Sequence, residues 1–330
     1  MEHVQLGRTG LRVSRVCLGT MTFGLQCDED ESRAILDRAA DGGVTFLDTA
    51  DVYPVGGSLD TVGRTEEILG RWLRGRRDDY VVATKCFGRM GAAPWKQGNS
   101  RKHILDAVDE SLRRLDTEYI DLYQLHGPDP RTPLEETLEA MDTLVRSGKV
   151  RYIGVSNWLA WQLALAVGRV EARSLAGFVS IQPRYNLLFR EFERELFPLC
   201  EAEGIGVIPY NPIAGGMLSG KHVADSGPTE GTRFTLGGAA QRYQDRYWND
   251  RAFATVDELR GVADEAGIPL PTLAVAWVLA NPVVTSPIIG ASRPDQLDAT
   301  LAAVDTELDA DLLATLDELT VAYRFGDAAR

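Results

Sequence analysis

The sequence contains few of the side chains from which metal sites and disulfide frameworks are built. Its 330 residues include four cysteines and four histidines, and the cysteines lie without metal or disulfide spacing. We therefore expect free thiols in a reducing compartment. A metal-dependent barrel hydrolase would need several ligands at strand ends. Only one histidine, His126, ends a predicted strand, so no metal site is expected.

Long apolar runs and basic surfaces are also missing. No run of 18 apolar residues occurs, which argues against a membrane-spanning helix. Residues 1–4 show neither the basic start nor the apolar core of a signal peptide, so a cytoplasmic location is expected. The formal charge of −13 argues against a nucleic-acid-binding surface. The partner expected is a small molecule, and an oligomer is possible.

Short apolar runs alternate with amphipathic helical segments along the chain. After a hairpin over residues 3–13, the predicted strands cover residues 16–20, 45–49, 80–85, 120–125, 152–155, 178–182, 206–210 and 286–289. Several runs are almost wholly apolar, as in parallel strands buried on both faces. Helices are expected over residues 30–40, 100–115, 132–147, 161–172, 191–203, 251–266, 271–280, 295–303 and 309–322. The sequence Thr132-Pro133-Leu134-Glu135 predicts a capping box.

This alternation predicts a (β/α)8 TIM barrel formed by residues 1–330 as one domain. A doubly wound sheet is the alternative, but it usually carries Gly-x-Gly-x-x-Gly after its first strand, and Met-Thr-Phe-Gly follows residue 20 here. Two long connections, residues 87–99 and 221–250, leave the carboxyl ends of strands. Because barrel enzymes carry out chemistry at that face, both are candidate walls or lids.

Four polar side chains occur at or just beyond the carboxyl ends of predicted strands. Asp48 ends the second strand, Lys85 the third and His126 the fourth, and Tyr53 follows Asp48 by five residues. A tyrosine that donates a proton near neutral pH is expected to need a pKa below about 10, which a neighbouring ammonium would provide. A carboxylate would keep that lysine charged, and a histidine would orient the substrate oxygen. Each residue alone has a structural explanation, but the combination predicts a proton-donating site.

Several segments occur in an order and spacing found together in one group of enzymes. They are residues 48–53 (Asp-Thr-Ala-Asp-Val-Tyr), 83–85 (Ala-Thr-Lys), 122–126 (Leu-Tyr-Gln-Leu-His), 154–157 (Gly-Val-Ser-Asn), 209–216 (Pro-Tyr-Asn-Pro-Ile-Ala-Gly-Gly) and 289–292 (Ile-Gly-Ala-Ser). With them, almost the whole chain resembles the aldo-keto reductase superfamily, including its potassium-channel-β-subunit-like branch. The resemblance implies a catalytic tetrad of Asp48, Tyr53, Lys85 and His126, with Tyr53 as the acid. It also implies hydride transfer from a nicotinamide, or alternatively a cofactor-loaded regulatory or redox-sensing subunit with slow turnover.

The same resemblance implies the positions that hold NADPH or NADP+. Asp48 is among them, with Gly19, Thr20 and Met21 near the ribose, Ser156, Asn157 and Gln182 at the carboxamide, and Tyr210 stacked on the nicotinamide. Residues along the pyrophosphate are Asn211, Pro212, Ile213, Ala214 and Gly215, with Lys221 and Arg233 as a cationic clamp. The adenosine end comprises Gly290, Ser292, Arg293 and Gln296. Ser292 and Arg293 favour NADPH over NADH, because they can bind a 2′-phosphate.

The expected substrate is an aldehyde or a ketone. Sugars and secondary-metabolite ketones are among the candidates. Its pocket is expected to be lined by Phe23, Val52, Trp95 and Trp158, together with the loop after the seventh strand.

Overall fold

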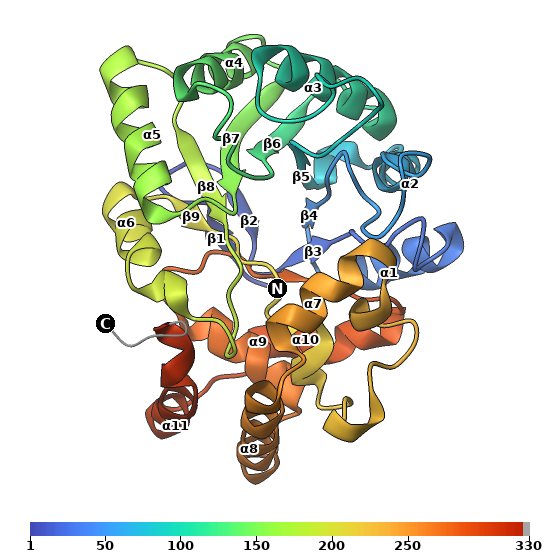
Figure 1. Cartoon of the computed structure of the whole chain (residues 1–330), viewed down its shortest axis with the longest axis vertical. Helices are drawn as coiled ribbons and strands as arrows, with labels where there is room; N and C mark the ends of the chain where they lie inside the picture. Colours follow the sequence, from blue (N-terminus) through green and yellow to red (C-terminus); the bar gives the residue numbers. More distant parts are fainter. Residues whose placement is uncertain (326–330) are drawn as a thin grey trace.

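The computed structural model describes residues 1–325, and its centre is a sheet of eight parallel strands (Figure 1). Neighbours in the sheet follow the order β10-β3-β4-β5-β6-β7-β8-β9. The strands are β3 (Cys17–Gly19), β4 (Phe46–Asp48), β5 (Val81–Cys86), β6 (Ile120–Leu125), β7 (Val150–Ser156), β8 (Phe178–Gln182), β9 (Gly206–Val207) and β10 (Ile288–Ile289). This confirms the predicted eight-stranded parallel architecture.

Short contacts join the two edges of the sheet and close it into a barrel. Isolated parallel bridges pair Val207 with Val284 and Tyr210 with Ile288. The Ile288 amide donates to the carbonyl of Pro209 at 2.8 Å. Closure leaves no free sheet edge and brings the carboxyl ends of all eight strands around one mouth.

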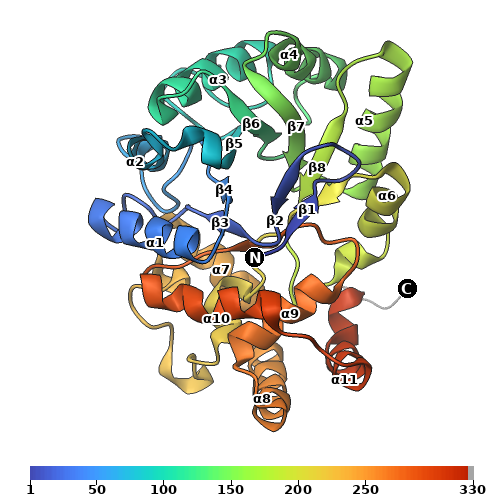
Figure 2. The same cartoon turned by 180° about the vertical axis from the view of Figure 1, so that it is seen from behind.

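An antiparallel hairpin, β1 (His3–Gln5) with β2 (Arg12–Ser14), lies against the amino-terminal end of the barrel (Figure 2). Its apolar residues Leu6 and Val13 are fully buried and belong to the same core cluster as Cys17, Phe46, Ala83, Leu122, Ile208 and Ile288. The hairpin therefore covers the amino-terminal end of the barrel. The four cysteines are free, as the sequence predicted, and all four are buried.

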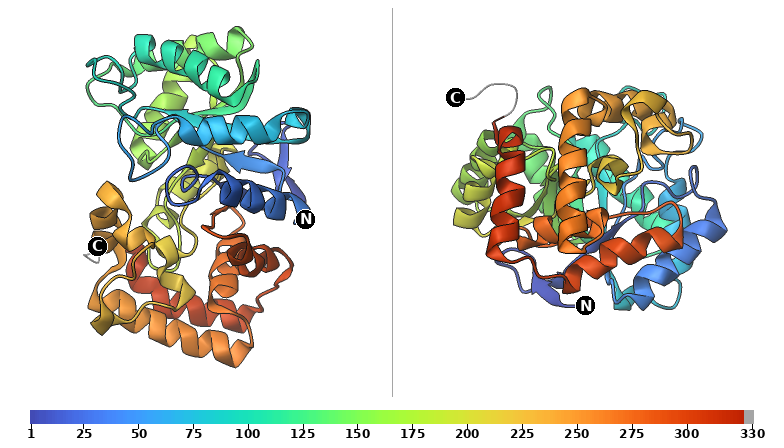
Figure 3. Two further views of the ribbon diagram at one scale, coloured as in Figure 1. Left: turned by 90° about the vertical axis from the view of Figure 1, so that its right-hand side faces the viewer. Right: turned by 90° about the horizontal axis from the view of Figure 1, so that it is seen from below.

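Helices surround the sheet, and their apolar faces form a second core layer against the outer side of the strands. They are α1 (Glu29–Asp41), α2 (Arg64–Leu73), α3 (Arg101–Leu115), α4 (Leu134–Arg146), α5 (Ala160–Arg173), α6 (Leu196–Glu203), α7 (Ala240–Tyr247), α8 (Asp250–Ala266), α9 (Leu270–Ala280), α10 (Leu297–Ala302) and α11 (Ala310–Thr320). Figure 3 shows the carboxyl-terminal helices, coloured orange to red, packed together at one end of the molecule.

No helix among residues 1–325 is by itself long and apolar enough to span a membrane. The pair α8 and α9 passes such a test only when taken together, and the two helices meet at an angle of 91°.

Some details differ from the sequence prediction. Helices α2 and α7 were not expected, and the segments predicted at 191–203 and 295–303 each begin with a separate 3-10 turn. The capping box predicted at Thr132 is wrong, because Pro133 is the N-cap residue and has no side-chain hydrogen bond to the helix. The Thr132 hydroxyl donates instead to the carboxylate of Asp129 at 2.8 Å.

A buried ion pair joins the unexpected helix α2 to α3. Arg114 Nε donates to Glu66 Oε2 at 2.7 Å, and 7% and 0% of the two side chains are exposed. The other Glu66 oxygen accepts from the Thr84 hydroxyl on β5 at 2.5 Å. The two helices can approach this closely because Gly70 has no side chain: a Cβ there would lie 2.5 Å from the Arg114 carbonyl oxygen.

We expect Arg114→Met to lower the free energy of unfolding by about 3–5 kcal/mol, because it leaves the Glu66 carboxylate buried and unpaired. Urea unfolding measures the effect. The control is Lys102→Met, which removes one partner of an exposed pair, 59% and 60% accessible, and is expected to cost less than about 1 kcal/mol. Losses of equal size would show that Glu66 does not depend on Arg114.

Candidate active site

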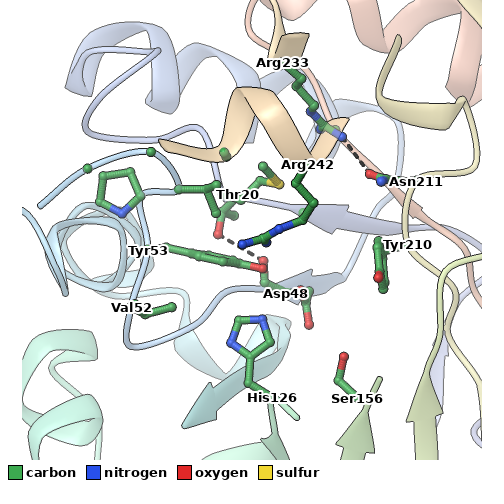
Figure 4. A pocket seen from close by; sticks show the side chains of 18 of the residues that line it. Thr20, Asp48, Val52, Tyr53, His126, Ser156, Tyr210, Asn211, Arg233 and Arg242 are labelled. Carbon is green, nitrogen blue, oxygen red and sulfur yellow. Dashed lines mark hydrogen bonds between the residues drawn. The ribbon is translucent and has the colours of Figure 1, made fainter. Parts of the chain in front are cut away.

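The four side chains predicted to form a proton-donating site meet at the carboxyl-terminal mouth of the barrel, and Figure 4 shows three of them, Asp48, Tyr53 and His126. Lys85 is fully buried, and its Nζ donates to Asp48 Oδ1 at 2.5 Å and to the Thr49 carbonyl at 2.7 Å. The same Nζ lies 5.0 Å from the centre of the Tyr53 ring. The Tyr53 and His126 rings meet edge to face, with centroids 5.7 Å apart.

Two glutamines hold the second carboxylate oxygen of Asp48. Gln124 on β6 donates to Oδ2 at 3.1 Å and Gln182 on β8 at 2.8 Å. Gln182 was expected at a nicotinamide carboxamide, but its amide nitrogen donates to Asp48. Gln124 was missed by sequence reasoning. It precedes His126 by two residues, and this strand periodicity directs both side chains to the barrel interior.

Burial and charge act in opposite directions on the pKa of Lys85 and of Tyr53. Burial lowers the pKa of Lys85, but Asp48 and Tyr53 beside it raise the value above the ordinary one, so the ammonium stays charged. Burial raises the pKa of Tyr53 to about 12, although Lys85 lowers it in part. The expected lowering of the tyrosine pKa is therefore wrong, because desolvation of the phenolate exceeds the effect of the ammonium.

His126 is neutral at physiological pH. Burial, followed by the positive charges of Lys85 and Arg242, lowers its pKa to about 3. A neutral imidazole carries one N–H group, so the ring can donate a hydrogen bond to a ligand oxygen without adding a positive charge to the cavity.

The mouth of the barrel holds a cavity of about 690 Å³, within the usual range for a small-molecule site. Many of the residues predicted for the tetrad and the cofactor line it: Gly19, Thr20, Met21, Asp48, Tyr53, His126, Ser156, Asn157, Gln182, Tyr210, Asn211, Arg233 and Gly290. Lys85 lies beneath this surface, against Asp48. No three metal-ligating side chains cluster anywhere in residues 1–325.

Hydrogen bonds connect three of these residues across separate strand ends. The Tyr210 hydroxyl donates to Asn157 Oδ1 at 2.8 Å, and Asn157 Nδ2 donates to the His126 carbonyl at 2.9 Å. The Ser156 hydroxyl donates to the carbonyl of Gln182 at 2.9 Å. This network fixes the wall opposite Tyr53 and leaves the Tyr210 ring on the cavity surface.

The long connection after β9, residues 221–250, covers one side of the mouth. The sequence predicted this connection as a wall or lid. Arg233 Nη1 donates to Asn211 Oδ1 at 2.9 Å. The Tyr243 ring of α7 lies over Gly215, where a Cβ would come within 2.7 Å of a ring carbon. Packing of Tyr243 therefore accounts for the small residue at 215. The residues expected along a pyrophosphate beyond Asn211 do not line the cavity: Pro212, Ile213, Ala214 and Gly215.

Three cationic residues predicted for phosphate binding lie near one another. The pKa of Lys221 is lowered by burial and then by the charges of Arg293 and Arg233. Close by, the buried Asn211 Nδ2 has no hydrogen-bond partner among the described residues. A cationic cluster with an unpaired buried donor suits the phosphates of a dinucleotide, although Lys221 and Arg293 do not line the cavity itself. Ser292 and Gln296 also lie outside it and bond to each other, with Gln296 Oε1 accepting from the Ser292 amide at 2.9 Å.

The cavity lining differs from the predicted substrate pocket in three of four residues. Val52 lines the cavity, but Phe23 is fully buried in the hydrophobic core and the side chain of Trp95 is 54% exposed on its loop. Trp158 packs edge to face on Phe178, with centroids 5.7 Å apart, and borders a separate depression. Apolar residues after Tyr53 and residues of α7 take their place: Val55, Leu59, Val62, Arg242, Tyr243 and Arg246. Arg242 and Arg246 are four residues apart, so they lie on one face of a helix. This spacing was the signal in the sequence that could have placed both side chains at the cavity.

Comparison with known proteins decides the family. The Aldo/keto reductase family profile matches residues 15–321. The chain belongs to this family. The oxidoreductase YrpG of Bacillus subtilis is 40% identical over 97% of this chain and 96% of its own length. A probable voltage-gated potassium channel subunit beta of Arabidopsis thaliana is 39% identical over 92% of both chains, and versiconal hemiacetal acetate reductase of Aspergillus parasiticus is 33% identical over 96% of both.

Family membership fits the barrel and the mouth described above. The protein is an oxidoreductase of the aldo/keto reductase family, whose enzymes act on carbonyl substrates and typically use NAD(P)H.

We expect His126 to stay neutral between about pH 5 and 8, because its pKa lies near 3. The unfolded chain takes up this proton near pH 6.5, so acidification from there toward pH 3 favours unfolding at this residue. Ring nitrogen chemical shifts of labelled protein measure the protonation, and a His126→Gln variant assigns the signal. A titration midpoint near 6.5 would contradict the burial argument.

Proposed function

We propose that the protein reduces an aldehyde or ketone with NADPH and that Tyr53 is the general acid. The observation that carries the proposal is the buried Lys85–Asp48 pair against the Tyr53 ring, beside a neutral His126 on the same cavity. When bound, the nicotinamide cofactor supplies the hydride that reduces the carbonyl carbon. The chain supplies the proton and the positions of the reacting groups.

Tyr53 is suited to deliver that proton. With a pKa of about 12 it is fully protonated before the reaction, and an alkoxide is a stronger base than a phenolate. The proton therefore passes from the Tyr53 hydroxyl to the substrate oxygen as the negative charge develops there. Lys85 stabilises the phenolate that remains, and Asp48 keeps Lys85 charged. The neutral His126 donates a hydrogen bond that orients the substrate oxygen.

The proposed cofactor site uses the wall opposite Tyr53. Tyr210 would stack on the nicotinamide, and Asn157 and Ser156 would contact its carboxamide. Asn211 and Arg233 would hold the pyrophosphate. The preference for NADPH over NADH is supported by the mutually repelling charges of Lys221, Arg233 and Arg293, which a 2′-phosphate would offset.

Tyr53→Phe is expected to lower kcat for carbonyl reduction by about 10²–10⁴-fold, because it removes the transferable proton. The affinity for NADPH should stay within about twofold of the unmodified protein's. Steady-state oxidation of NADPH with 4-nitrobenzaldehyde and fluorescence titration measure the two quantities. Tyr80→Phe is the matched control, because Tyr80 lies just before the amino-terminal end of β5, away from the mouth of the barrel. Retained turnover in Tyr53→Phe would remove Tyr53 as the acid.

Arg293→Ala is expected to weaken NADPH binding about tenfold while changing NADH binding less than twofold, because only NADPH presents a 2′-phosphate. Fluorescence titration with both nucleotides measures this. Arg113→Ala, which removes an exposed arginine paired with Glu110 on α3, is the control. Equal losses for NADPH and NADH would show that Arg293 does not read the 2′-phosphate.

One relative favours a second candidate function. The plant protein that is 39% identical over 92% of both chains bears the name of a potassium channel subunit. A regulatory subunit would hold the same cofactor but turn over slowly. Tight NADPH binding without turnover on a panel of aldehydes and ketones would favour this function, whereas turnover on any of them favours the reductase.

A further inference from the structure

The cavity concentrates positive charge in a chain whose net charge is −13. Its charged lining consists of one carboxylate and four guanidinium groups: Asp48, Arg89, Arg233, Arg242 and Arg246. The carboxylate is already paired with Lys85. The proposed cofactor phosphates account for Arg233, so the excess of positive charge on the substrate side still lacks a counterion.

The four arginines of the cavity differ in whether they have a protein partner. Arg233 donates to Asn211, and Arg89 donates to the backbone carbonyls of Gly91 and Ala92. Among the described residues, Arg246 has neither a hydrogen bond nor an ion pair, and neither does Arg242. Its nearest acidic neighbour on α7, Asp245, accepts a hydrogen bond from Gln241 instead.

Figure 4 shows the Arg242 side chain running from α7 into the cavity, toward the side on which Tyr53, Asp48 and His126 lie. Its charge acts on the His126 ring, whose pKa it helps to lower. Arg233 lies on a different side of the cavity, at Asn211 and Gly290. Arg242 is therefore placed to contact the substrate rather than the cofactor phosphates.

We propose that Arg242 binds an anionic group on the carbonyl substrate, so that the preferred substrates are aldehydes or ketones bearing a carboxylate. The planar guanidinium fork matches a carboxylate with two parallel hydrogen bonds. A carbonyl oxygen at Tyr53 and His126 leaves the rest of the molecule facing α7. The inference rests on the proposed reductase function, because the reacting carbonyl fixes where the anionic group lies.

The test compares two aldehydes that differ in charge but little in shape: 4-carboxybenzaldehyde and methyl 4-formylbenzoate. The unmodified protein is expected to show the higher kcat/KM with the carboxylate. Arg242→Met should lower kcat/KM for the carboxylate by about 10- to 100-fold, mainly through KM, because a charge-assisted hydrogen bond is lost. The ester should change less than threefold, and Arg242→Lys should restore part of the preference. Higher salt should reduce the preference, because Arg242 is open to solvent.

A binding measurement distinguishes two outcomes: that the inference about Arg242 is wrong, or that the proposed reductase function itself is wrong. Calorimetric titration of 4-carboxybenzyl alcohol into the NADP+-saturated protein reports anion binding without turnover. If neither aldehyde is reduced, the proposed function fails, and an affinity for this alcohol that falls about tenfold in Arg242→Met still supports the anion site. If the ester is reduced and the carboxylate shows no advantage that depends on Arg242, the inference alone is overturned.

Fluorescence titration with NADPH decides between substrate and cofactor as the partner of Arg242. We expect Arg242→Met to bind NADPH within twofold of the unmodified protein, while Arg233→Met loses affinity. An NADPH loss in Arg242→Met as large as that in Arg233→Met would assign Arg242 to a cofactor phosphate and overturn the proposal.

Discussion

The structure of the site depends on one buried ion pair, between Lys85 on β5 and Asp48 on β4. An isolated ammonium at this depth would lose its proton, and an isolated carboxylate would gain one. Each charge persists because the other is in contact with it and because further polar groups satisfy both: the Thr49 carbonyl on the lysine, and Gln124 and Gln182 on the aspartate. Contacts from β4, β5, β6 and β8 therefore converge on a single charge pair, and barrel closure is what brings those strands together.

The surroundings of Tyr53 favour its protonated form before the proposed reaction begins. A tyrosine with a pKa near neutral pH would exist partly as phenolate, so only part of the protein would carry a proton to donate. Burial instead keeps the phenol protonated, and the ammonium beside it lowers the cost of forming a phenolate only when the proton leaves. The surroundings thus suit a proton that is transferred during the reaction, rather than one lost beforehand to water.

The sequence predicted the strands, most helices and the meeting of the four tetrad residues, because strand periodicity and strand-end position determine where Asp48, Lys85 and His126 point. It did not predict α2, because Gly70 weakens the helical pattern of this segment. The glycine is needed there because α2 packs closely on α3. It also placed Trp95 and Trp158 in the pocket on residue type alone. Trp95 lies on a long loop and Trp158 in the short connection between β7 and α5, and neither position has a periodicity that fixes the direction of the side chain. Arginines of α7 line the cavity in their place. The tyrosine pKa was missed because the extent of burial is not readable from neighbouring residue types.

The proposed catalytic residues and the proposed substrate wall are separate in the sequence as well as in space. The tetrad comes from strand ends between residues 48 and 126, whereas Arg242, Tyr243 and Arg246 belong to one eight-residue helix within a connection that contributes no strand. Changes in α7 can therefore accumulate without disturbing the buried ion pair or the barrel. In evolutionary terms, substitutions on the cavity side of this helix could alter the proposed substrate wall while leaving the proposed catalytic residues unchanged.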